Sequence, residues 1–292
     1  MTEPAPAART ASNSAAATHP VPPREPPEID TSVAHAARVY DYLLGGTDNF
    51  AVDRAAAEAQ LAAMGNTLEK TRAEIQANRA FLGRAVRYLA REAGIRQFLD
   101  LGTGIPNADN VHAVAQQVAP DARIVYVDND PLVLAYAHSL LQSTPQGAAA
   151  YIDGDLRSPE SVLAHAAATL DLAKPVAVML ISLLHLVPDS DDPYGIVDGF
   201  MSRMPSGSYL VITQLTKDIQ PEAMAALERS APATAQYSFV MRSHAELSRF
   251  FDGLELVEPG VVSVDRWHPD TEPPPGSDAE AVPFYGAVGR KP

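Results

Sequence analysis

The sequence predicts an α/β fold in which a mostly parallel seven-stranded sheet includes one antiparallel terminal strand and follows a helical N-terminal extension. Three observations predict this fold. From residue 97 onward, short apolar runs alternate with amphipathic stretches, which is typical of a parallel sheet covered by helices. The last two apolar runs are joined by loop signals alone, so they should pair antiparallel. Before residue 97, apolar residues recur at helical spacing instead.

The first thirty residues are rich in proline and alanine and contain few large aliphatic side chains. Such a segment cannot bury enough apolar surface to fold, so we expect a disordered arm over residues 1–30. It also lacks the apolar central region of a signal peptide. We expect two further parts, a helical segment or lid over 31–95 and the sheet domain over 96–292.

Within the helical segment, the oxygens of residues 30–32 should cap a helix that ends at Gly45-Gly46, because glycine readily takes the left-handed conformation of a helix end. Two more helices are predicted over 53–64 and 68–93. The expected strands of the sheet domain are residues 98–101, 124–127, 150–152, 176–181, 209–212, 254–264 and 284–288, with a helix over 244–251 capped by Ser243.

Composition excludes several classes of function. The chain has 292 residues with Lys+Arg 22 and Asp+Glu 36, a formal net charge of −14, and no basic stripe that would hold nucleic acid or anionic lipid. Its longest apolar stretch, 176–184, is about half the ~20 residues of a membrane span. There are no cysteines, and no His, Asp and Glu cluster has the spacing of metal ligands. We therefore expect a cytoplasmic protein without a metal, a membrane or a nucleic-acid partner; the oligomeric state is left open.

The carboxyl ends of parallel strands form the usual ligand site of such a sheet, so the residues after each apolar run are the candidates. After the first run, Gly102 and Gly104 allow a tight turn and a close approach to a ligand, and Asp100 can accept hydrogen bonds. A structural turn is the alternative interpretation. After the second run, Asp128 lies 24 residues beyond Gly104, a spacing suited to binding ribose hydroxyls. Asn129 follows it at the same edge.

The third and fourth runs add further candidates. Asp155 can accept the amino group of an adenine while Leu156 packs on the ring, although Asp155 can equally cap a helix. Ser182 follows the fourth run, and His185 lies at the mouth of the same cleft, where it is either a buried core residue or a base. Together, the four strand ends predict an adenosine-containing ligand.

The first loop distinguishes between possible adenosine ligands. Dinucleotide sites commonly use G-x-G-x-x-G, but Asn107 stands at the third glycine position. Asp100 and Asp109 would also bring negative charge near a phosphate. S-adenosylmethionine carries adenosine, a sulfonium and an ammonium but no phosphate, so it fits better than NAD.

These features resemble those of a known family. Residues 99–104, Leu-Asp-Leu-Gly-Thr-Gly, resemble the first motif of Rossmann-like class I methyltransferases, with Pro106 where a third glycine often stands. More narrowly, residues 38–46, Asp48-Asn49-Phe50, 78–82 and 191–194 resemble the actinobacterial S-adenosylmethionine-dependent methyltransferase family long catalogued as a domain of unknown function. The resemblance runs from about Ser32 to Arg290.

The resemblance implies roles for particular residues. Asp100, Gly102 and Gly104 would hold the methionine part of the cofactor, Asp128 its ribose, and Asp155 with Leu156 its adenine. Tyr40 and Asn49 belong to a polar, aromatic segment that can close over the cofactor, or that merely packs. Asn78 and Arg79 are weaker candidates, and Tyr42 and Asp265 are candidates for the substrate pocket.

The expected activity is transfer of a methyl group from S-adenosylmethionine to a hydroxyl or amine of a small molecule by in-line displacement, which depends chiefly on alignment. His185 is the expected general base. Two alternatives remain open at this point: a non-catalytic S-adenosylmethionine sensor or partner protein, and an NAD-dependent oxidoreductase.

Overall fold

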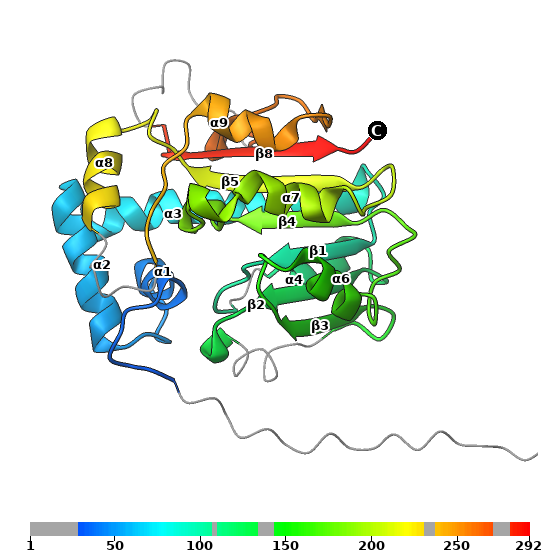
Figure 1. The fold of residues 1–292 in the computed structure, drawn as a ribbon, viewed down its shortest axis with the longest axis horizontal. Helices are drawn as coiled ribbons and strands as arrows, with labels where there is room; N and C mark the ends of the chain where they lie inside the picture. Colours follow the sequence, from blue (N-terminus) through cyan, green and yellow to red (C-terminus); the bar gives the residue numbers. More distant parts are fainter. Residues whose placement is uncertain (1–28, 107–109, 134–142, 231–236, 271–280) are drawn as a thin grey trace, which may run out of the picture.

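The computed structural model describes residues 29–106, 110–133, 143–230, 237–270 and 281–292. The expected N-terminal arm, together with Asn107 and Asp109, lies outside these residues apart from positions 29 and 30. Figure 1 shows one sheet flanked by helices, with α1, α2 and α8 gathered at one end of its strands. In the described part of the chain, no helix combines the length and apolar character that a membrane span needs.

The sheet follows the order β3-β2-β1-β4-β5-β8-β6, with β7 also paired to β8. β1 to β5 run parallel, whereas β8 pairs antiparallel with β5, β6 and β7. The strands are β1 (Gln97–Leu101), β2 (Arg123–Asp128), β3 (Ala148–Asp153), β4 (Ala177–Ile181), β5 (Tyr209–Leu215), β6 (Glu255–Leu256), β7 (Val262–Ser263) and β8 (Phe284–Arg290). The predicted α/β fold with one antiparallel strand and a helical extension is confirmed.

The number of strands differs from the prediction. The run expected as one strand over 254–264 divides into β6 and β7, so the sheet has eight strands among the described residues instead of seven. Pro259 has no backbone N–H to give to a ladder, and Gly260 turns the chain with φ 84°. The chain therefore leaves β8 after Leu256 and rejoins it at Val262.

Two apolar layers cover the sheet. Alternate strand residues face opposite sides, as Phe98 and Leu99 do. The Phe98 side packs against α3 (Leu68–Arg91), α4 (Val111–Val118) and α8 (Pro221–Ser230). The Leu99 side packs against α6 (Pro159–Ala166), α7 (Pro193–Met201) and the region of α9 (His244–Ser248). Both faces of β1, β4 and β5 are buried, which accounts for their nearly continuous apolar sequences, whereas the edge strand β3 is half-buried.

The N-terminal helices form a third apolar cluster beside the strand ends. α1 (Ala36–Leu44) and α2 (Ala51–Met64) contribute its side chains together with Ile75 of α3. The expected start of the first helix is wrong, since α1 begins at Ala36 with His35 as its N-cap. The Asp30 carboxylate instead accepts hydrogen bonds from Ser32, so its capping capacity is used within the loop. The expected end at Gly45 is confirmed by its left-handed φ of 94°.

Candidate functional site

The four strand ends meet at a cavity of about 1150 Å³, between the sheet and the N-terminal helices. Its wall includes Gly102 and Gly104 after β1, Asp128 and Asn129 at the end of β2, and Ser182 after β4. Pockets that hold one drug-sized ligand commonly have volumes of about 300–1,000 Å³. The volume of this cavity lies just above the upper end of that range.

The loop after β1 takes a conformation that requires both of its glycines. Gly102 and Gly104 each have φ 66°, a left-handed conformation that costs about 1–2 kcal/mol for other residues. A Cβ on Gly102 would also lie 2.4 Å from the Leu183 side chain, whereas a Cβ on Gly104 would meet nothing within 4 Å. Gly102 thus allows close packing of the loop on the end of β4, and Gly104 leaves space toward a ligand.

Asp128 ties the first two strand ends together. Its Oδ2 accepts the N–H of Gly104 at 2.8 Å, and its Oδ1 accepts the N–H of Asp130 at 2.9 Å. The side chain is buried, which raises the pKa of its carboxyl group. Each carboxylate oxygen can accept more than one hydrogen bond. Asp128 therefore keeps acceptor capacity for a pair of hydroxyl groups.

Asp100 is a buried carboxylate in the cavity wall. The Thr103 hydroxyl and the Arg79 guanidinium lie near it, and both favour its ionised form. Burial raises the pKa of Asp100 to about 7, against the opposing effect of the Arg79 guanidinium. A buried carboxyl group in the wall of a cavity is suited to accept hydrogen bonds from a ligand cation.

The third strand end differs from the sequence interpretation. Gly154 and Leu156 line the cavity, but Asp155 does not. Asp155 is 41% exposed, and its Oδ1 accepts the N–H of Arg157 and lies 3.2 Å from the Arg157 guanidinium. That guanidinium also binds Asp191 at 2.7 Å. In this arrangement Asp155 behaves as a turn residue and an ion-pair partner, so its adenine contact stays a prediction.

At the fourth strand end, Ser182 has an unusual φ of 55° and its N–H donates to Thr213 Oγ1 at 2.9 Å. Its hydroxyl accepts the side-chain amide of Asn78 at 2.7 Å, and the same amide lies 3.3 Å from the Tyr40 hydroxyl. Asn78 is fully buried, and its Oδ1 has no partner among the described atoms. This network joins α1 and α3 of the extension to the end of β4.

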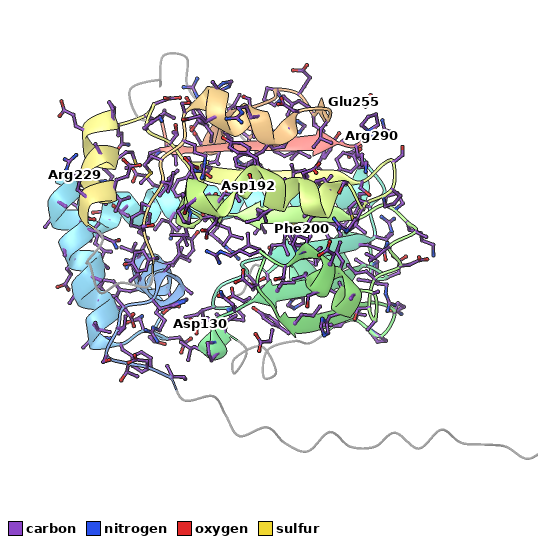
Figure 2. All side chains as sticks on the ribbon, viewed as in Figure 1. Asp130, Asp192, Phe200, Arg229, Glu255 and Arg290 are labelled. Carbon is purple, nitrogen blue, oxygen red and sulfur yellow. The ribbon has the colours of Figure 1, made fainter. Side chains whose placement is uncertain are left out.

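The N-terminal helices are fixed above the cavity by a buried ion pair. The Arg38 guanidinium binds the Asp53 carboxylate at 3.1 Å, and Asp53 also accepts the N–H of His35. His35 Nδ1 lies 2.9 Å from Asp130 Oδ2, which links the extension to the rim of the sheet. Figure 2 shows Asp130 at this end of the molecule, and the Glu255–Arg290 ion pair at the opposite end.

The other predicted residues of the extension occupy different positions. Tyr40 lines the cavity, and burial raises the pKa of its hydroxyl group. Asn49 does not line it: its amide donates to Asp41 Oδ2 at 2.8 Å, and its Oδ1 accepts from Arg54. Asn49 therefore supports the loop after α1, and a direct cofactor contact stays a prediction.

Beyond the strand ends, the cavity continues into a region that we call the apolar chamber. His185 borders it and stacks on Phe239 with 6.1 Å between ring centroids, and Phe239 meets Tyr237 at 5.5 Å. Gln60 holds the Tyr237 hydroxyl at 2.8 Å. We define the chamber by its side chains from β5, α8, the segment before α9 and β8: Leu215, Met224, Leu227, Tyr237, Phe239 and Phe284.

His185 lies between the strand ends and the chamber, but its environment is unlike that of a histidine poised near neutral pH. Burial lowers the pKa of its imidazole to about 3, with a further contribution from the Arg242 guanidinium. Its Nδ1 has no hydrogen-bond partner among the described residues. His185 is thus neutral at pH 7 and can exchange a hydrogen bond with a ligand.

Sequence reasoning gave little or no role to several residues that the fold brings to the cavity. Arg79 was a minor candidate, whereas Glu74, Arg157, Tyr237 and Phe239 had no assigned role. A signal for Arg79 was available in the sequence, because it directly follows Asn78 within the 78–82 segment of the family resemblance. For the others, membership of the site depends on contacts across long stretches of chain. No group of three or more His, Asp or Glu residues in the described ranges is placed to hold a metal.

Comparison with known proteins gives consistent matches. The model of a family described as S-adenosyl methyltransferase matches residues 22–292. A DUF574-family protein from Streptomyces avermitilis is 46% identical, with TM-score 0.85, over 91% of this chain and 100% of that one. A proposed methyltransferase from Thermobifida fusca is 39% identical, with TM-score 0.80, over 90% and 96%. No curated protein matches the sequence.

Proposed function

Because this chain belongs to the S-adenosyl methyltransferase family, we propose that it transfers the methyl group of S-adenosylmethionine to a hydroxyl or amine of a small molecule bound in the apolar chamber. One observation carries the proposal: a single cavity joins the carboxylate-bearing strand ends to an apolar region bordered by His185. The cavity volume of about 1150 Å³ exceeds the usual range for a pocket that holds one drug-sized ligand. In this proposal, the acceptor binds in the apolar chamber and the cofactor binds at the strand ends.

The strand ends fit S-adenosylmethionine in charge and in hydrogen-bonding capacity. Asp100, whose carboxylate is buried in the cavity wall, would accept hydrogen bonds from the ammonium of the methionine part. Asp128 would bind the ribose hydroxyls, and Gly154 with Leu156 would cover the adenine. When bound, the cofactor supplies a methyl group on a sulfonium.

The protein's contribution to methyl transfer is alignment and exclusion of water. In-line displacement needs the attacking atom, the methyl carbon and the sulfur in one line, and holding reactants in such geometry can contribute about 7–11 kcal/mol of the barrier. The Asn78 network ties the helical extension to the end of β4, so α1 and α3 are held over the strand ends. We infer that this cover keeps water from the reacting atoms and that Tyr40 contacts the cofactor.

For His185, we propose a hydrogen bond to the acceptor's hydroxyl or amine, through which it receives the proton released on methylation. A pKa of about 3 makes the imidazole a weak base. The protonated form would therefore be short-lived, and orientation of the acceptor is the larger part of the proposed role. This role is weaker than that of a base with a pKa near neutrality.

The acidic character of the cavity supports S-adenosylmethionine over a phosphate-bearing cofactor. Asp100, Asp128 and Asp130 all lie in the wall near the glycine loop. Their charges would repel a pyrophosphate, whereas they favour a ligand that carries a sulfonium and an ammonium.

The experiment is incubation of the full chain with methyl-labelled S-adenosylmethionine and a metabolite extract, followed by separation of small and large molecules and mass spectrometry of labelled products. We expect label in a small molecule, on oxygen or nitrogen, and none with an Asp128→Ala variant. Label in protein or nucleic acid alone would contradict a small-molecule acceptor. Cofactor binding without any labelled product would favour a non-catalytic binder.

A further inference from the structure

A buried carboxylate, that of Glu74 on α3, lies at the edge of the apolar chamber. Glu74 lines the cavity and is 9% exposed. Its Oε1 accepts the side-chain amide of Gln220 at 2.9 Å. Gln220 directly precedes α8, whose Met224 and Leu227 form part of the chamber. The contact therefore places the Glu74 carboxylate where α3 meets the chamber wall.

The second oxygen of this carboxylate is available to a ligand. Among the described residues, Oε2 of Glu74 makes no hydrogen bond, and it is not one of the fully enclosed polar atoms. The nearest cation is Lys70, whose Nζ lies 3.7 Å from Oε1 and whose side chain is 51% exposed. An ion pair so exposed to water is weak. Glu74 thus keeps most of its negative charge and one free acceptor atom beside the cavity.

Of the arginines that line the cavity, Arg38 on α1 binds Asp53 and Arg157 after β3 binds Asp155 and Asp191. The other two lie on α3, but on another face than Glu74. Thr71, Asn78 and Leu82 share the face of Glu74, at spacings of three, four and eight residues. Arg79 and Arg87 are five and thirteen residues beyond Glu74, which turns both of them about 140° away around the helix. The chamber side of α3 is therefore acidic, and an anionic acceptor would be repelled there.

We propose that the chamber binds an acceptor with an apolar or aromatic body and a protonated amine, and that Glu74 is the anchor for that amine. Phe239 and Tyr237 offer ring faces and edges for the body. A protonated amine has no free electron pair, so it cannot attack the methyl group itself. In this proposal it anchors the acceptor at Glu74, and a second group of the same molecule, a hydroxyl or a neutral amine, faces His185 and receives the methyl group. This inference rests on the proposed function, because it treats the chamber as the acceptor site.

The test is titration calorimetry on the full chain saturated with S-adenosylhomocysteine, using phenylpropylamine, phenylpropanol and phenylpropanoate as matched probes. We expect the amine to bind about tenfold or more tightly than the alcohol, and the acid to bind most weakly, because a charge-assisted hydrogen bond is about twice as strong as a neutral one. Glu74→Gln should reduce the preference for the amine to within about threefold, by the same reasoning.

Two controls separate a charge effect from loss of structure. Glu69→Gln removes an exposed carboxylate from the first turn of the same helix and should keep the full preference. Phe239→Ala should weaken all three probes to a similar degree and leave their order unchanged. S-adenosylhomocysteine affinity and the melting temperature of each variant report on folding.

The outcomes are distinct from those of the labelling experiment. Equal affinity for the three probes, preference for the acid, no measurable binding of any probe, or an unchanged preference in Glu74→Gln would overturn the amine anchor. If methyl transfer to small molecules fails while the amine preference and its loss are observed, the proposed reaction is wrong but the amine site stands.

Discussion

The two halves of the cavity are built from different kinds of structure. At the strand ends, several contacts involve backbone: Asp128 accepts the N–H groups of Gly104 and Asp130, and the Ser182 N–H donates to Thr213. In the apolar chamber, polar groups are held by other side chains, as Gln60 holds Tyr237 and Gln220 holds Glu74. Backbone contacts persist when side chains change. We therefore expect substitution to reshape the chamber, the proposed acceptor half, more readily than the strand ends, the proposed cofactor half.

The largest effect should come from Asp128, the residue that joins two strand ends. Asp128→Ala removes an acceptor for the ribose and frees the Gly104 N–H, so we expect S-adenosylmethionine affinity to fall by about 100-fold, on the basis of about 1.5–3 kcal/mol for each hydrogen bond to a charged group. Titration calorimetry measures this loss of affinity for S-adenosylmethionine. Asp155→Asn is the matched comparison, and we expect a much smaller loss because Arg157 already holds that carboxylate. Equal losses of affinity in the two variants would contradict the different roles that we assign to Asp128 and Asp155.

A second test uses pH on the cofactor half. The ammonium of the cofactor prefers ionised Asp100, whose pKa is about 7, so affinity for S-adenosylmethionine should rise by about tenfold between pH 6 and pH 8. Because the folded-state pKa lies above the unfolded value, the free protein binds more protons than the unfolded chain from about pH 4 to 7. Its stability should therefore fall as pH rises through that range.

Asp100→Asn provides the control for both readouts. The variant should lose this pH dependence of affinity, and its thermal unfolding should respond less to pH between 4 and 7. A wild-type affinity that is flat from pH 6 to 8 would show that Asp100 does not meet the ammonium.

The third test addresses the boundary between the halves. His185→Ala should lower kcat/KM by about fivefold, within the 0.5–1.5 kcal/mol of one neutral hydrogen bond, and leave cofactor affinity unchanged. With a pKa of about 3, His185 should add no inflection to the kcat/KM profile between pH 5 and 8. A loss of about 100-fold or more, with an inflection near neutrality that the variant removes, would instead identify a tuned general base.

The smallest effect is expected inside the chamber. Tyr237→Phe leaves the Gln60 amide without its partner while keeping the ring, so the acceptor KM should rise by no more than about threefold, since one neutral hydrogen bond contributes about 1 kcal/mol. Steady-state kinetics at saturating cofactor measures the change. The affinity of this variant for the cofactor should stay unchanged. A changed cofactor affinity would mean that the strand ends and the chamber are coupled.

The two halves of the cavity also differ in how far their contacts could be predicted from a single sequence. The β1 loop and Asp128 are linked by strand topology and by a spacing of 24 residues, and their hydrogen bond was therefore within reach of pattern analysis. Glu74 and Gln220 are 146 residues apart, and Arg157 meets Asp191 across 34. The helix and strand periods that a sequence reveals do not link residues so far apart, so these contacts could not be predicted. The burial that lowers the pKa of His185 likewise depends on Phe239 and Phe284, which lie far from it in the sequence.

The fold as a whole was more predictable than its boundaries. Glycines at 45 and 46, the Ser243 cap and the alternation of apolar runs all act locally, so their outcomes follow from nearby residues. The first turn of α1 depends instead on His35 and on its contact with Asp53, 18 residues away. Local capping rules placed that start too early.

The position of β8 has a consequence for how the protein is made. β8 (Phe284–Arg290) lies between β5 and the short strands β6 and β7, so it holds together pieces of chain that were synthesised well before it. While the ribosome still covers β8, one side of β5 has no partner and β6 and β7 have nothing to pair with. An unpaired strand edge is a ready template for aggregation. The nascent chain should therefore depend on chaperones until Arg290 emerges, and stalling just before that point should be far more harmful than an equally short deletion in the N-terminal arm.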